Sequence, residues 1–179
     1  MRFNDRVMTD APERFATWVS TDIAPFLRAD RFTKSGLNFH KRGQEGWGVV
    51  NFQKSPWGSR AETQFTINLG VALDVLAPVF GRDPAKKPPD SMCHWSERIG
   101  LLLDAPRDTW WGVKDGTDLQ ALTAEILPLL RDRALPAIEE RMTAEGFLRR
   151  MRSDDRASLM PSGLRRKMPE LPDAGGVNT

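Results

Sequence analysis

Residues 47–71 read WGVVNFQKSPWGSRAETQFTINLGV, and this stretch decides the fold. It predicts two β-strands, residues 48–54 and 62–71, joined by the corner SPWG at residues 55–58. The corner fits a type I turn, which favours proline in its second place and glycine in its fourth. Because side chains alternate along a strand, each strand should present one apolar face and one polar face.

The two faces of this predicted hairpin differ in chemistry. The apolar face carries Val50, Phe52, Phe65, Ile67, Leu69 and Val71. The opposite face carries amides and a hydroxyl, on Asn51, Gln53, Gln64, Thr66 and Asn68. Lysine and glutamate would be the usual choice for a face that only meets solvent, so the uncharged amides suggest a recognition surface.

Further strands are predicted on both sides of the hairpin. Residues 37–42 alternate in the same way, and the short loop at 43–46 favours an antiparallel meander. Residues 93–103 fit the spacing of a helix or of a strand, and we favour the strand. A strand would put His94, Ser96 and Arg98 on the polar face. Its other face would carry Cys93, Trp95, Ile99 and Leu101. Residues 110–113 should form a short final strand.

Two helical regions flank these strands. The first should begin near Asp10, which stands three residues before Glu13 as in a capping box. An apolar stripe follows at helical spacing, and Pro25 should kink or end the helix. The last helix should begin with a second capping box at Thr117 and Gln120, and prolines should break or bend it at Pro128 and Pro136.

Composition describes an ordinary globular chain. Its 179 residues fit one domain, with 40% hydrophobic and 28% charged residues. Its single cysteine cannot form an internal disulfide, so we expect a reducing compartment, the cytoplasm. No segment reaches the roughly 18 apolar residues of a membrane span, and we expect no membrane association.

Charge is distributed unevenly along the chain. Seven basic and four acidic residues follow Glu145, which gives this end +3, whereas the 19 basic and 20 acidic residues before it give −1. We therefore expect a single domain at residues 10–146 and a flexible basic tail at 147–179. The tail could contact nucleic acid weakly, but Asp154 and Asp155 dilute its charge, so a nucleic-acid partner is a minor alternative.

Several short motifs occur in a familiar order. They are VNFQKS at 50–55, FTINLG at 65–70, HW at 94–95, RIG at 98–100 and WW at 110–111. In these motifs the chain resembles a bacterial family known as domain of unknown function 4304. The resemblance covers roughly residues 15–136. It implies a small cytoplasmic α+β domain and supplies no activity and no catalytic residues.

The residue types give little support to metal or covalent chemistry. The soft or borderline ligands are His40, Cys93 and His94, fewer than the four Cys or His ligands of a structural zinc site, and we expect no metal or cofactor. Cys93 should be a small buried residue, and it could pair with His40 as a nucleophile only if the fold joins them. The sequence GRDPAKK at 81–87 is only superficially like a phosphate loop.

These observations predict an α+β fold in which an antiparallel sheet of four to five strands packs against N- and C-terminal helices. The expected core is Phe15, Trp18, Phe39, Val50, Phe52, Phe65, Ile67, Leu69, Ile99 and Leu122. For function we expect a non-catalytic binding module, of immunity or regulatory type, that takes an unknown protein or a small polar ligand on its polar face. The candidate contact residues are Asn51, Gln53, Gln64, Thr66, Asn68, His94 and Arg98. The alternative is an enzyme that uses His94 and Arg98 in a cleft.

Overall fold

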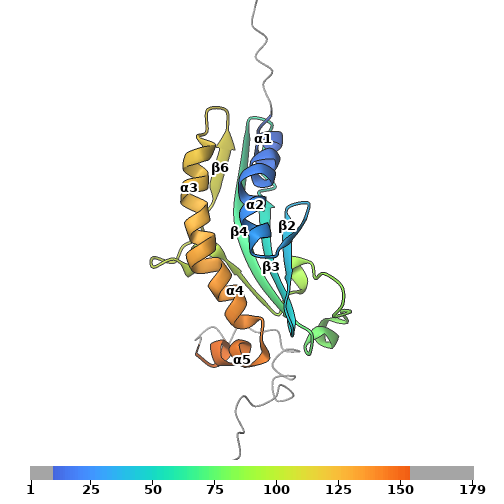
Figure 1. The fold of residues 1–179 in the computed structure, drawn as a ribbon. Helices are drawn as coiled ribbons and strands as arrows, with labels where there is room; N and C mark the ends of the chain where they lie inside the picture. The colour runs from blue at the N-terminus through green and yellow to red at the C-terminus, as the bar shows by residue number, and fades with distance from the viewer. Residues whose placement is uncertain (1–9, 154–179) are drawn as a thin grey trace, which may run out of the picture.

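A computed structural model describes residues 10–153. In this range one antiparallel sheet of six strands is covered on one face by the N-terminal and C-terminal helices (Figure 1). The strands follow the order β1-β2-β3-β4-β5, and β6 pairs with β4 beyond the end of β5. The α+β class is therefore confirmed, with more strands than the sequence predicted.

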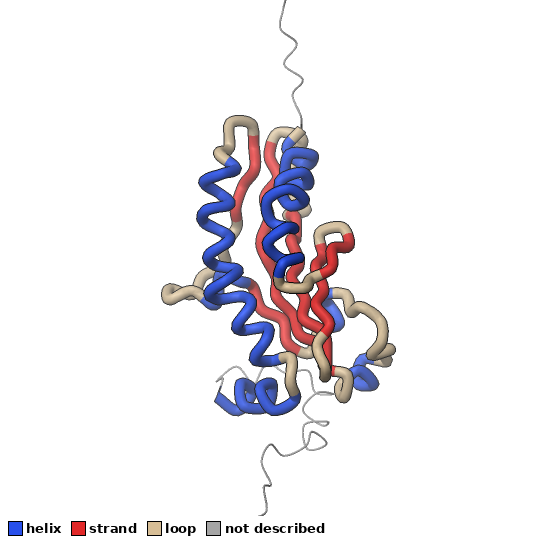
Figure 2. Tube along the Cα trace, viewed as in Figure 1, coloured by secondary structure: helices blue, strands red, loops and turns tan. Residues whose placement is uncertain are grey.

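The strands are β1 Thr33–Ser35, β2 Asn38–Arg42, β3 Gly46–Lys54, β4 Glu62–Leu73, β5 Trp95–Arg98 and β6 Trp111–Lys114. The α-helices are α1 Ala11–Trp18, α2 Ala24–Ala29, α3 Leu119–Leu129, α4 Leu135–Arg141 and α5 Ala144–Ser153. Two π-helical turns, η1 Val19–Ile23 and η5 Leu130–Ala134, join these helices into longer rods (Figure 2). Short 3₁₀-helices are η2 Ala77–Phe80, η3 Asp90–Met92 and η4 Ile99–Leu102. No helix within residues 10–153 has the length and apolarity needed to cross a bilayer.

The β3–β4 hairpin has the predicted alternation. Phe52 pairs with Ile67 on the helix-covered face, and Asn51 pairs with Asn68 on the opposite face. All ten residues of the expected core are buried in one cluster between the sheet and the helices. Strand β1, which the sequence did not reveal, adds a short edge beside β2.

The helix starts are set by aspartate side chains. Asp10 accepts a hydrogen bond from the Glu13 backbone N–H at 3.0 Å, which confirms the first predicted start. The second prediction is wrong by one residue, because Asp118 caps α3 by accepting from the backbone N–H groups of Gln120 and Ala121. The hydroxyl of Thr117 instead accepts from the backbone N–H of Lys114 in the preceding turn.

The helical rods change to π-helical turns before Pro25 and Pro136 instead of stopping there, whereas Pro128 lies inside α3, which continues to Leu129. The turn η1 ends two residues before Pro25, and η5 ends two residues before Pro136. A proline lacks the backbone donor and its ring collides with the carbonyl four residues earlier. A π-helical turn just before the proline accommodates both the missing hydrogen bond and the steric collision, so the rod continues across the sheet.

The segment at 93–103 is a strand only in part. Strand β5 ends at Arg98, and the 3₁₀-helix η4 follows, so the predicted strand positions of Ile99 and Leu101 are wrong. Within η4 the backbone at Gly100 lies close to the returning loop, since a Cβ there would be 2.3 Å from the Arg107 carbonyl oxygen. Cys93 does not share a face with Trp95 either: it precedes β5 and packs against Gly70.

The C-terminal boundary also differs from the prediction. Helix α5 continues to Ser153, and Phe147 and Leu148 within it are 0% and 3% exposed. The backbone N–H of Ala144 donates to Glu45 Oε2 at 2.7 Å, which fastens the start of α5 to the β2–β3 loop. Residues 147–153 are thus packed on the domain, and the remaining part of the expected tail, 154–179, lies outside the described residues.

Arg31, which follows α2, has a left-handed backbone with φ of 66°. Its N–H donates to the Arg28 carbonyl, and the N–H of Phe32 donates to the Leu27 carbonyl, so this conformation closes the helix end. A Cβ is unfavourable in this region and glycine avoids the strain. We expect Arg31→Gly to raise the free energy of unfolding by about 0.5–1 kcal/mol, measured by urea denaturation. Arg31→Ala keeps the Cβ and should show no such gain; an equal gain would contradict the strain.

Candidate functional site

Two segments cover parts of the sheet face opposite the helices. Residues 74–94 cross one end of this face (Figure 1), where Trp47, Val49, Ala72 and Cys93 form a small second core. Residues 99–110 turn back over another part, and the Thr109 carbonyl accepts a hydrogen bond from the hydroxyl of Thr66 at 2.9 Å. The polar surface expected from the sequence is therefore covered in part, and it stays open between these two segments and at Gln64.

His94 is buried under the first segment. Its Nδ1 accepts a hydrogen bond from the Leu73 backbone N–H at 2.9 Å, and its Nε2 lies 3.0 Å from the Leu76 carbonyl, to which it must donate. The ring is therefore neutral with its proton on Nε2. It stacks on Phe80, and burial lowers the pKa of His94 to about 4. Both ring nitrogens hold the covering segment in place, and neither is available to a substrate.

His40 and Trp47 fasten the same segment to the sheet. His40 Nε2 lies 2.9 Å from the Pro88 carbonyl, and Trp47 Nε1 donates to the Pro84 carbonyl at 2.9 Å. Burial lowers the pKa of His40, which is 6% exposed. Through these contacts the proline-rich loop at residues 83–90 is attached to the sheet at Pro84 and Pro88.

A row of amides crosses the sheet beside this segment. Asn51 Nδ2 donates to Asn38 Oδ1 at 2.7 Å. Asn68 Nδ2 donates to Asn51 Oδ1 at 3.1 Å and to Gln53 Oε1 at 2.8 Å. We call Asn38, Asn51, Asn68 and Gln53 the amide row. The Nδ2 groups of Asn51 and Asn68 face defined acceptors, and the side-chain oxygens of Asn38 and Gln53 face defined donors, so these hydrogen bonds set the orientation of all four amides.

An open hollow of about 460 Å³ lies at the end of the amide row. Its lining residues are Gln53, Asn68, Asp90, Ser96, Glu97, Arg98, Leu101 and Asp108. Three of the expected contact residues, Gln53, Asn68 and Arg98, thus meet in one place, and Asn51 lies next to them in the row. Thr66 is buried under residues 99–110, and Gln64 is exposed outside the hollow. His94 does not line the hollow either, so it and Arg98 do not share a cleft.

Arg98 is engaged by groups of its own loop. Its guanidinium donates to Asp108 and lies 5.1 Å from the centre of the Trp110 ring. The hydrogen bond from Arg98 lowers the pKa of the Asp108 carboxyl. A guanidinium that already holds a carboxylate has lost much of its capacity for an anionic ligand.

Several residues that line this hollow were not among the expected contacts, and Asp90 is the one of them with a buried, unpaired oxygen in the described range. Its Oδ1 is buried beside Gly70, and within residues 10–153 no donor reaches it. Burial raises the pKa of Asp90 because the charged form loses solvation. The available signal was Gly70 itself, since a glycine inside a strand often marks the close approach of another segment.

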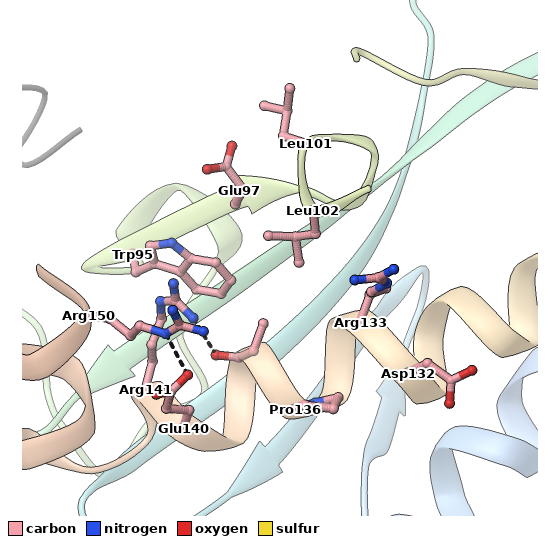
Figure 3. Close-up of a pocket in the computed structure, with 11 residues that line it drawn as sticks. Trp95, Glu97, Leu101, Leu102, Asp132, Arg133, Pro136, Glu140, Arg141 and Arg150 are labelled. Atoms are coloured by element: carbon pink, nitrogen blue, oxygen red, sulfur yellow. Dashed lines mark hydrogen bonds and ion pairs between the residues drawn. The ribbon is translucent and has the colours of Figure 1, made fainter. Parts of the chain in front are cut away.

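A second hollow of about 440 Å³ lies between β5 and α4 and shares Glu97 and Leu101 with the first. Figure 3 shows the Arg141 guanidinium beside Trp95, at 4.4 Å from the ring centre. Arg150 donates to Glu140 at 2.6 Å. The cationic groups of this hollow are therefore engaged by neighbouring side chains.

Cys93 and the described acidic groups do not assemble a reactive centre. Cys93 is buried, as expected, and burial together with the charge of Asp90 raises the pKa of its thiol to about 12. No group of three or more His, Cys, Asp or Glu residues in the described range could hold a metal ion. Arg82 and Lys86, in the stretch compared with a phosphate loop, belong to a turn that Arg82 braces by donating to the Lys86 carbonyl.

Comparison with known proteins adds one family assignment. A family model described as a domain of unknown function (DUF4304) matches residues 23–140. No curated protein and no solved structure matches the chain. The matched range contains the whole sheet, the amide row and both hollows apart from Arg141 and Arg150, and it ends before α5.

Proposed function

This chain belongs to the DUF4304 family, and from its geometry we propose that it is a non-catalytic binding module. It recognises a protein partner or a small polar ligand through the hollow beside the amide row. The observation that carries this proposal is the fixed orientation of the row. Asn51 and Asn68 use their Nδ2 groups within the row, so their side chains are held in place before any ligand arrives. Such pre-organisation reduces the entropy lost on binding.

The character of the hollow supports binding over catalysis. The enzyme alternative requires His94 and Arg98 in one cleft, whereas His94 has both ring nitrogens in backbone hydrogen bonds and Arg98 holds Asp108. An acid–base group needs an ionisable atom within reach of the substrate. Cys93, the single thiol, is buried with a raised pKa. An open, polar surface of this kind suits recognition.

An immunity or regulatory role in the cytoplasm fits this proposal. Such proteins act by holding a partner and need a rigid, specific surface with no reactive groups. A reducing cytoplasm would also keep Cys93 as a free thiol. Nucleic-acid binding has less support, because Arg149 and Arg150 in α5 both donate to Glu140, which leaves less charge for phosphates.

The proposal is tested by blocking the hollow. Ser96 is exposed and lines the hollow, so Ser96→Trp should fill it without disturbing the core. We expect the wild-type protein, immobilised and exposed to native lysate, to retain a protein or small molecule that Ser96→Trp retains at least tenfold less. Retained material is measured by mass spectrometry.

The matched control is Gln64→Trp, which adds the same ring to an exposed residue of the same face outside the hollow. This variant should retain the ligand as the wild type does. Equal retention by all three proteins, or no specific retention by the wild type, would refute binding at the hollow.

A further inference from the structure

The floor of the hollow presents a hydrogen-bond acceptor. Asn68 is 7% exposed and lines the hollow. Its Nδ2 donates to both Asn51 and Gln53, which leaves Oδ1 as the atom of this amide that can meet a ligand. In the described part of the chain no donor reaches this Oδ1. A ligand group at this position must therefore be a donor.

The wall of the hollow presents a carboxylate. Asp90 lies beside Gly70. Gly70 follows Asn68 by two residues, so Asp90 lies on the same face of β4 as the Asn68 side chain. Between residues 10 and 153 the Asp90 side chain has no hydrogen bond and no ion pair, although its Oδ1 is buried. A half-buried carboxylate without a partner is unfavourable, and a cation beside it would compensate its charge.

The balance of charge in the hollow also favours a cation. Three carboxylates, of Asp90, Glu97 and Asp108, and one guanidinium, of Arg98, line it. Because Arg98 donates to Asp108, these two charges largely cancel, and Glu97 makes an interaction of its own. Among residues 10–153 the carboxylate of Asp90 has no cation paired with it. An unpaired arginine would suit an anionic ligand, but Arg98 is paired with Asp108, and the geometry favours a cation.

We propose that the hollow binds the cationic side chain of a lysine or arginine on a protein partner. This inference rests on the proposed function and specifies its ligand. The cation would donate to Asn68 Oδ1 and to the carboxylate of Asp90. Gln53 uses its Oε1 to accept from Asn68, so its Nε2 can donate to a backbone carbonyl of the partner. A partner's side chain fits better than a free amine, because an open hollow encloses little of a small molecule.

The test uses the full chain and small peptide mimics. N-acetyl-lysine methylamide carries the ammonium on a lysine side chain, and N-acetyl-norleucine methylamide has the same carbon chain without the charge. We expect the lysine mimic to shift the NMR signals of the Asn68 side-chain amide and of the Gly70 and Ser96 backbone in a saturable way. The norleucine mimic and N-acetyl-glutamate methylamide should not shift them. Butylammonium tests a free amine and should bind more weakly than the lysine mimic.

The role of Asp90 is tested by Asp90→Asn, which keeps the shape and removes the charge. This variant should bind the lysine mimic about tenfold more weakly and should melt at a higher temperature, because an unpaired carboxylate has been removed. The control is Asp115→Asn, at an exposed carboxylate that pairs with Arg14 outside the hollow. It should leave the affinity unchanged.

The outcomes separate this inference from the proposed function. If Ser96→Trp abolishes retention from lysate but the lysine mimic shifts no signal of the hollow, the cationic ligand is wrong and the binding function stands. The same conclusion follows if the glutamate mimic binds, if butylammonium binds more tightly, or if Asp90→Asn has no effect. If Ser96→Trp also changes nothing, both proposals fall.

Discussion

Phe65→Ala is expected to lower the free energy of unfolding by about 3–5 kcal/mol. Phe65 is fully buried, and its ring centre lies 4.7 Å from that of Phe15, 5.4 Å from that of Trp18 and 5.7 Å from that of Trp111. These rings come from α1, β4 and β6, so Phe65 joins the first helix to two neighbouring strands of the sheet. The truncation removes apolar contacts and leaves a cavity that aromatic neighbours cannot refill without losing their own packing.

The measurement is urea denaturation followed by circular dichroism, and the control is Trp57→Ala. Trp57 is also aromatic and belongs to the corner that joins β3 to β4, but it is 89% exposed. Its removal should change the free energy of unfolding by no more than about 0.5 kcal/mol. A cost below about 1 kcal/mol for Phe65→Ala would mean that the aromatic cluster is not the centre of the fold.

The core of this fold could be predicted because it follows from a local pattern. Phe52 and Ile67 are each fixed by alternation within their own strand, and the corner at 55–58 sets the register that makes them partners. The same alternation brought Asn51 and Asn68 together on the opposite face. Neither conclusion needed knowledge of a distant segment.

The surroundings of the polar face could not be predicted in this way, because they depend on segments that fold back over the sheet. A histidine such as His94 has the same local sequence whether it meets water or the carbonyl of Leu76. The sequence around Asp90 likewise gives no sign of what this residue packs on, because its position beside Gly70 depends on contacts made twenty residues away. What could not be predicted from the sequence was therefore the packing between segments that lie far apart along the chain.

Acid should destabilise the protein because His94 must remain neutral in the fold. Its pKa in the folded protein is about 4, below the ordinary histidine value of 6.5. Below pH 6.5 the unfolded chain binds a proton at this residue that the folded protein does not, so the stabilisation present above pH 6.5 is lost as pH falls towards 4. Between pH 7 and pH 5 this linkage should lower the free energy of unfolding by about 2 kcal/mol. Denaturation midpoints at a series of pH values measure it.

Two other groups in this region titrate, and NMR separates them from His94. Burial also lowers the pKa of His40, which adds to the acid sensitivity, whereas the raised pKa of Asp90 opposes it once the pH approaches the range of carboxylates. The ring signals of His94 should therefore stay those of the neutral form, with the proton on Nε2, down to pH 5. In the protonated form both ring nitrogens carry hydrogens, and Nδ1 would then face the Leu73 N–H donor without an acceptor. Titration of His94 near pH 6.5 in the folded protein would show that residues 74–94 do not hold the ring as described. The position of Asp90 in the wall of the hollow would then also be wrong, because Asp90 belongs to the same segment.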